Sequence, residues 1–176
     1  IDRATWLLRY SAFRAPFGPG PVREIAGDNA AYRRDALVRH LPMFRDGFWE
    51  VEFHVRLRTE GGRLEAVPDA TASMVASEPF GAFLRHRFEH GARFGAWRVR
   101  SAGMSLIRVV LATPLVPFVI TGRSLRRVAD RPRVLLRSLS ALPALLLLGT
   151  AWAAGEAWGA LNSRHTPPLL HEEIPS

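Results

Sequence analysis

Residues 138–155 read SLSALPALLLLGTAWAAG and contain no charged side chain. As a helix, these 18 residues would extend roughly 27 Å, close to the roughly 30 Å hydrocarbon core of a bilayer. A second uncharged stretch, VVLATPLVPFVITG at 109–122, is shorter and contains Pro114 and Pro117. We therefore expect 138–155 to cross a membrane and 109–122 to form an interfacial or re-entrant segment. The alternative is that both are core helices of a soluble bundle, although so small a protein has little polar surface to cover them.

An arginine-rich connector separates these two stretches. Its only acid is Asp130, and its basic residues are Arg123, Arg126, Arg127, Arg131, Arg133 and Arg137. The positive-inside rule places such a connector on the cytoplasmic face, close to anionic lipid headgroups. If residues 1–100 are also cytoplasmic, only the second stretch would cross, with residues 163–176 on the far side. A helical hairpin that never crosses the membrane is the alternative topology.

The composition excludes several classes of protein. The 176 residues are 48% apolar and 23% charged, which is ordinary globular usage and not that of a disordered chain. Since there is no cysteine, a disulfide scaffold and a cysteine nucleophile are both excluded. The net charge of +8 comes entirely from arginine, because lysine is absent. Nucleic acid is only a third choice of partner, since no aromatic–basic motif of a known module accompanies the arginines.

The first hundred residues alternate short strand and helix patterns, which predicts an α/β fold class. We expect one helix around residues 6–13 that ends before Pro16, from the helical spacing of its apolar side chains. Further helices are expected over 30–40 with Asn29 as N-cap, over 49–60 and over 79–100. Strands are expected over 22–26, 63–67 and 71–75. The predicted organisation is a first domain at 1–100, membrane-associated helices at 101–162 and a tail at 163–176.

Three motifs in this first part carry a family resemblance. They are GDNAAYRRDAL at 27–37, GFWEVEFHVRL at 47–57 with Gly61 downstream, and HGARF at 90–94. In this order they resemble the C-terminal half of a membrane-associated family 2 glycosyltransferase of the GT-A fold. The GEAWG stretch at 155–159 is also similar to apolar C-terminal segments of membrane-associated members.

The resemblance implies a partial GT-A-like domain followed by apolar helices. It implies an inverting glycosyltransferase with a nucleotide-sugar donor and a lipid-linked or cell-envelope glycan acceptor. The expected location is the cytoplasmic face of a bacterial-type inner membrane. No Asp-x-Asp occurs among the 176 residues, so the nucleotide-binding half that this motif marks is missing from this chain.

Glu50 is the candidate catalytic base, because it opens a predicted helix after Gly47 and the helix N-terminus favours an ionised carboxylate. Glu52 is its rival, on a different face of the same helix. The family motif usually has an acid where this chain has Trp49, which is a candidate stacking platform for a sugar. Glu50 could instead be an ordinary first-turn acid, and Trp49 could instead be an ordinary buried tryptophan.

The remaining candidates bind substrate or metal. Arg93 and Arg87 would contact the diphosphate leaving group. His90 would complete a Mn²⁺ or Mg²⁺ site, a cofactor implied by the resemblance only. All three could instead form a solvated basic face. Asn29 is a candidate acceptor ligand or simply an N-cap.

The alternative function is a non-enzymatic, membrane-anchored helical protein whose arginines bind anionic lipid or a partner protein.

Overall fold

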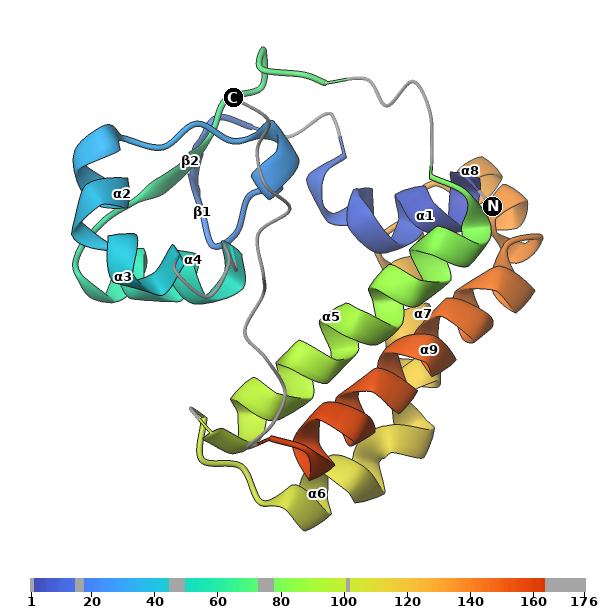
Figure 1. The fold of residues 1–176 in the computed structure, drawn as a ribbon. Coiled ribbons are helices and arrows are strands. Elements are labelled where there is room, and N and C mark those ends of the chain that lie inside the picture. Colours follow the sequence, from blue (N-terminus) through green and yellow to red (C-terminus); the bar gives the residue numbers. More distant parts are fainter. Residues whose placement is uncertain (1, 15–17, 45–49, 73–77, 101, 164–176) are drawn as a thin grey trace. The chain divides into compact units, whose positions relative to one another are not determined.

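The computed structural model describes residues 2–14, 18–44, 50–72, 78–100 and 102–163, and these are mostly helical (Figure 1). The chain divides into two compact units. We call residues 1–12 with 75–166 the helical unit, and residues 13–74 with 167–176 the mixed unit. The helix over residues 80–100, which the sequence pattern assigns to the first domain, belongs to the helical unit together with the apolar helices.

The helical unit contains the long helices of the chain. Its elements are α1 (Asp2–Arg9), α5 (Phe80–Arg100), α6 (Leu106–Ala112), the 3₁₀ turn η3 (Thr113–Leu115), α7 (Val116–Arg126), α8 (Pro132–Leu139) and α9 (Leu142–Leu161). The prediction of a helix over 79–100 is confirmed by α5, which begins directly after Pro79.

Helices α5 and α9 pack side by side in parallel, with their backbones in close approach (Figure 1). Each contributes two glycines four residues apart, Gly91 and Gly95 from α5 and Gly155 and Gly159 from α9. A Cβ at any of the four would overlap a carbonyl oxygen of the opposite helix. The crossing is therefore of the small-xxx-small type, in which only glycine lets the two backbones approach so closely.

The chain returns from α5 to α9 through α6, η3 and α7, which run in the opposite direction (Figure 1). Helix α9 packs against both α5 and this returning segment. At one contact a Cβ on Gly149 would lie 2.9 Å from the Cα of Pro117. A core of seven buried side chains holds one end of this unit, formed by Ala4, Leu7, Phe83, Val128, Ala141, Leu145 and Leu148.

The expectation that residues 109–122 are too short to span a membrane is corrected by the structure. The helical path continues over Leu106–Arg126, 21 residues, because the prolines only tighten the backbone into η3. Both this segment and Leu142–Leu161 are long and apolar enough to cross a membrane. A core helix passes the same test, and 44% of the second segment is buried compared with 17% of the first. Leu106–Arg126 is therefore the more exposed of the two.

The mixed unit contains short helices and a two-stranded antiparallel sheet. Its elements are β1 (Gly20–Val22), the 3₁₀ turn η2 (Gly27–Asn29), α2 (Arg34–Arg39), α3 (Leu41–Phe44), α4 (Glu50–Thr59) and β2 (Leu64–Ala66), while the 3₁₀ turn η1 (Ser11–Phe13) lies at the boundary between the units. Gly20 pairs with Ala66 and Val22 with Leu64. The predicted end of the helix before Gly61 is confirmed, since α4 ends at Thr59 and Gly61, two residues later, has a left-handed φ of +83°.

Two local predictions in this unit are wrong or untested. Asn29 does not cap a helix over 30–40: α2 begins at Arg34 with Arg33 at its N-cap. The side-chain amide of Asn29 instead donates a hydrogen bond to the carbonyl of Ala70, 3.2 Å away. Residues 71 and 72 form no strand, and the rest of the strand expected over 71–75 lies outside the described residues.

Candidate functional site

Glu50 lies against the turn that contains the first sequence motif. It is the first residue of α4, and its carboxylate occupies the space that a Cβ on Gly27 would take. Two motifs that are separate in the sequence, residues 27–37 and 47–57, therefore meet at Gly27 and Glu50. The helix N-terminus at Glu50 favours the ionised carboxylate.

Tyr32 and His54 extend this site, and neither was among the candidates from the sequence. The hydroxyl of Tyr32 lies 2.8 Å from Nε2 of His54, which is buried one helical turn after Glu50. Burial, followed by the negative charge of Glu50, raises the pKa of Tyr32 to about 12. Burial also lowers the pKa of His54, and Arg58 lowers it further while Glu24 opposes this shift. A protonated phenol therefore faces a neutral imidazole beside the carboxylate of Glu50.

Glu50 and its rival Glu52 have different surroundings in the structure. The carboxylate of Glu52 pairs with the guanidinium of Arg56 at 2.8 Å, one turn along the same helix. This is an i,i+4 ion pair with a half-exposed arginine, of the kind that contributes little to stability. Glu52 has an ordinary structural role, whereas Glu50 faces the Gly27 turn and the Tyr32–His54 pair.

The signal for His54 was present in the sequence, because residues 50 and 54 share one face of a helix. The aromatic residue of the first motif is Tyr32 itself. The ring of Phe53 contacts the ring of Tyr32 edge to face, with the two centroids 5.2 Å apart. Trp49, the proposed stacking platform, lies outside the described residues.

Arg87 occupies a desolvated position on α5 in the helical unit. Its guanidinium lies 4.2 Å from the ring centroid of Trp152 on α9, a cation–π contact. Its Nε atom is buried and has no hydrogen-bond partner among the described residues. Burial, and then the charge of Arg9, lowers the pKa of Arg87 to about 10.

His90 lies among basic groups on the same helix. His90 is exposed as a whole residue. Partial desolvation nevertheless lowers the pKa of His90 to about 4, and the charges of Arg93, Arg87, His86 and Arg9 act in the same direction. The pKa of Arg93 is lowered by burial, against the opposing effect of Glu89. The neighbours of His90 therefore suit an anion better than a metal cation.

The described residues do not fit a divalent metal site. Within 2–14, 18–44, 50–72, 78–100 and 102–163, no three histidine or carboxylate side chains gather where they could hold an ion. Glu50 and Asn29 belong to the mixed unit, and Arg87, His90 and Arg93 to the helical unit. Each of the two groups of predicted residues therefore lies within a single unit.

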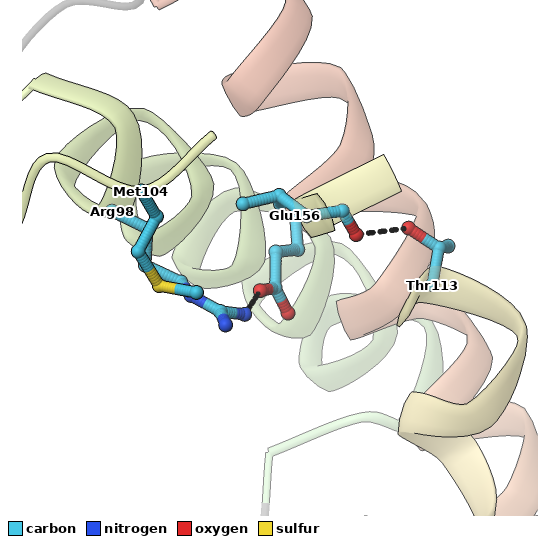
Figure 2. A network of polar contacts seen from close by, with 5 residues as sticks. Arg98, Met104, Thr113 and Glu156 are labelled. Carbon is cyan, nitrogen blue, oxygen red and sulfur yellow. Dashed lines mark hydrogen bonds and ion pairs between the residues drawn. The ribbon is translucent and has the colours of Figure 1, made fainter. Parts of the chain in front are cut away.

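A buried ion pair lies where α5 and α9 cross. Glu156 is 2% exposed, and its carboxylate accepts a hydrogen bond from the guanidinium of Arg98. The Nε of Arg98 also donates to the sulfur of Met104 at 3.1 Å, and the hydroxyl of Thr113 donates to the carbonyl of Val109 nearby (Figure 2). The GEAWG stretch thus has a structural explanation, because its glycines admit α5 and its glutamate pairs with Arg98.

An apolar stripe runs along the outside of α6, η3 and α7. It consists of five large side chains, each between 55% and 73% exposed, namely Ile107, Leu111, Leu115, Phe118 and Val119. Their spacing of mostly three or four residues places them on one face. Val109, Pro117, Thr121 and Ser124 are buried on the other face. An exposed apolar stripe of this kind is a candidate interaction surface.

Comparison with protein-family models, with curated proteins and with solved structures finds no match to this chain.

Proposed function

We propose that this chain is the acceptor-side, membrane-associated part of an inverting glycosyltransferase, with Glu50 as the catalytic base. The observation that carries the proposal is the contact between the Glu50 carboxylate and the Gly27 turn. Two of the three motifs that together carry the resemblance to family 2 glycosyltransferases meet there, in the same unit as the Tyr32–His54 pair. The GT-A fold is part of this proposal and rests on the resemblance.

The proposed reaction is a single displacement at the anomeric carbon of a nucleotide sugar. Glu50 accepts the proton of an acceptor hydroxyl, and the acceptor oxygen attacks the anomeric carbon. The bond from that carbon to the diphosphate breaks, and the nucleoside diphosphate leaves with the electron pair. The anomeric configuration is thereby inverted. Tyr32 keeps its proton because its pKa is about 12. Its hydroxyl can therefore donate a hydrogen bond, as it can to Nε2 of His54.

Arg87 and Arg93 are proposed to bind a diphosphate. Their support is their charge and their partial burial on α5 and, for Arg87, a buried Nε that has no hydrogen-bond partner among the described residues. The lowered pKa of each is consistent with cations partly removed from water. An anion would restore favourable electrostatics there. Since the described residues do not fit a metal, no step is assigned to Mn²⁺ or Mg²⁺.

Membrane association is supported by the two apolar helices and by the apolar stripe. The exposed arginines Arg123, Arg126, Arg133 and Arg137 follow the stripe, and they suit anionic headgroups. We place the protein on the cytoplasmic face of a bacterial-type inner membrane, where a lipid-linked or cell-envelope glycan would serve as acceptor.

The stripe also favours the second candidate function, a membrane-anchored helical protein without enzymatic activity. Such a protein would need the stripe and the arginines but would make no use of Glu50. Substitutions of Glu50 therefore distinguish the two proposals.

The test is transfer activity of the full protein in membranes supplied with Mg²⁺ or Mn²⁺. UDP-glucose, UDP-N-acetylglucosamine and GDP-mannose serve as donors, and released nucleoside diphosphate is measured. We expect Glu50→Gln to lose at least about a hundredfold in rate while retaining donor binding. The matched control is Glu52→Gln, two residues along the same helix, which should stay near wild type. Equal rates in the wild type and Glu50→Gln would remove Glu50 as the base, and absence of donor binding would favour the anchor.

A further inference from the structure

Helix α9 is packed closely against α5 along one side, so lipid could not surround α9 on its own. The two helices are locked by the four glycines whose Cα atoms face carbonyl groups of the opposite helix. Helix α9 therefore cannot enter hydrocarbon as an isolated segment without abandoning this crossing and the Arg98–Glu156 pair.

Helix α5 is unsuited to the interior of a bilayer. It carries ionisable side chains along most of its length, at Arg85, His86, Arg87, Glu89, His90, Arg93, Arg98 and Arg100. Charged residues are rare and costly inside a membrane unless they pair or line a water-filled cavity. If α9 crossed the membrane with α5 attached, most of these groups would lie at hydrocarbon depth.

The segment α6–η3–α7 exposes large apolar side chains along one side, which is the apolar stripe. Its other side, with the polar residues Thr121 and Ser124, is buried within the helical unit. Both ends carry exposed arginine, Arg108 at one end and Arg123 and Arg126 at the other. A one-sided apolar stripe with cations at both ends is the pattern of a helix that lies in the plane of the interface.

We infer that the helical unit docks on one leaflet of an anionic phospholipid bilayer through the apolar stripe, and that neither Leu106–Arg126 nor Leu142–Leu161 crosses it. This inference rests on the membrane association proposed above and specifies its geometry. The arginines at the ends of the stripe contact lipid phosphates. Helix α9 stays packed against both α5 and the segment α6–η3–α7, with Leu147, Trp158 and Leu161 exposed on its remaining side.

The docking surface is tested by liposome flotation of the full protein. Vesicles of phosphatidylcholine with phosphatidylglycerol should bind it, and vesicles of phosphatidylcholine alone should bind it more weakly. The double variant Leu111→Glu, Leu115→Glu should lose at least about tenfold in bound fraction, because two charges then replace apolar contacts with the lipid. The matched control is Val38→Glu, Val55→Glu, which places the same charges at exposed apolar positions of the mixed unit. Equal flotation of the stripe variant and the control would overturn the docking surface.

The topology is tested by single cysteines, since the natural chain contains none. Ala102→Cys and Ala129→Cys flank α6–η3–α7, and Ser140→Cys and Ser163→Cys flank α9. In sealed inverted membrane vesicles, a membrane-impermeant maleimide should label all four from the same side. Labelling of either pair from opposite sides would overturn the in-plane arrangement while leaving membrane association intact. Absence of wild-type flotation would instead remove the membrane association itself, together with this inference.

Discussion

The backbone of Gly95 in α5 lies against the carbonyl group of Glu156 in α9, so closely that a Cβ at position 95 would overlap its oxygen. The same glutamate extends its side chain to Arg98, one turn further along α5. One residue of α9 therefore joins the two helices through both its backbone and its side chain. This crossing fixes how the apolar helices pack.

We expect Gly155→Leu to destabilise the helical unit by about 3 kcal/mol or more, because the new side chain meets the backbone of Phe88 and not a movable side chain. The free energy of unfolding in urea measures this effect. Gly122→Ala is the matched control, since the new methyl group would have no atom within 4 Å and the site is exposed. This control should be neutral or up to about 1 kcal/mol more stable, as alanine is the better helix former. Similar losses in both variants would contradict the close crossing.

Glu156→Gln should destabilise the protein by about 1–3 kcal/mol, because it leaves the charge of Arg98 without its buried partner. The double variant Arg98→Met, Glu156→Gln should lose less than the sum of the losses in Arg98→Met and Glu156→Gln, and this double-mutant cycle measures the coupling. Glu52→Gln breaks an exposed pair and should cost less than about 1 kcal/mol. Strict additivity at Arg98 and Glu156 would show that the two groups do not interact.

Acid should weaken the mixed unit through His54. Since burial lowers the pKa of His54 in the folded state, the unfolded chain binds its proton more readily. The resulting stability is complete above the ordinary histidine pKa of about 6.5 and falls as the pH decreases below it. His54→Gln keeps an acceptor for Tyr32 but cannot titrate, so its stability should depend less on pH between 7 and 5. The free energy of unfolding across this range measures the difference, and equal slopes in both proteins would contradict a buried, neutral His54.

Gly27→Ala should displace the Glu50 carboxylate without greatly weakening the fold, because its new methyl group meets the flexible end of a side chain. We expect transfer activity to fall while the melting temperature changes little. A matched change at Gly18, where no atom lies within 4 Å, should leave activity unaltered. Full activity in Gly27→Ala would show that the contact with Glu50 is not needed for transfer.

Long, regular elements were predictable from the sequence, and contacts between distant segments were not. Helix α5 follows Pro79 as expected, and α9 covers most of the uncharged stretch, although residues 138 and 139 belong to α8 and α9 continues past Glu156 to Leu161. The glycine pairs of α5 and α9 were visible as residues, but nothing local indicates that they face each other. Asn29 shows the limit of local capping rules, because its amide bonds to Ala70, 41 residues away.

The candidate site was also predictable only in part, because its local motifs are visible in the sequence and the contacts between them are not. Glu50 and the turn at Gly27 were each recognised as motifs, but their contact depends on how the chain folds between them. Tyr32 and His54 were missed because a tyrosine and a histidine within helical or loop patterns are usually ordinary core residues. Their hydrogen bond becomes visible only when α4 packs beside residue 32.

The central claim, that Glu50 lies beside Tyr32 at the Gly27 turn, is tested most directly by ultraviolet titration of the phenol. Tyr10 and Tyr32 are the two tyrosines of the chain, so a Tyr10→Phe background isolates Tyr32. The phenolate absorbance should rise with a midpoint near the Tyr32 pKa of about 12, with circular dichroism at each pH confirming that the fold is intact. Glu50→Gln should lower this midpoint, because it removes a negative charge that opposes ionisation, whereas Glu52→Gln should leave it unchanged. Equal midpoints in the Glu50→Gln and Glu52→Gln proteins would contradict the placement of Glu50 on which the proposed function depends.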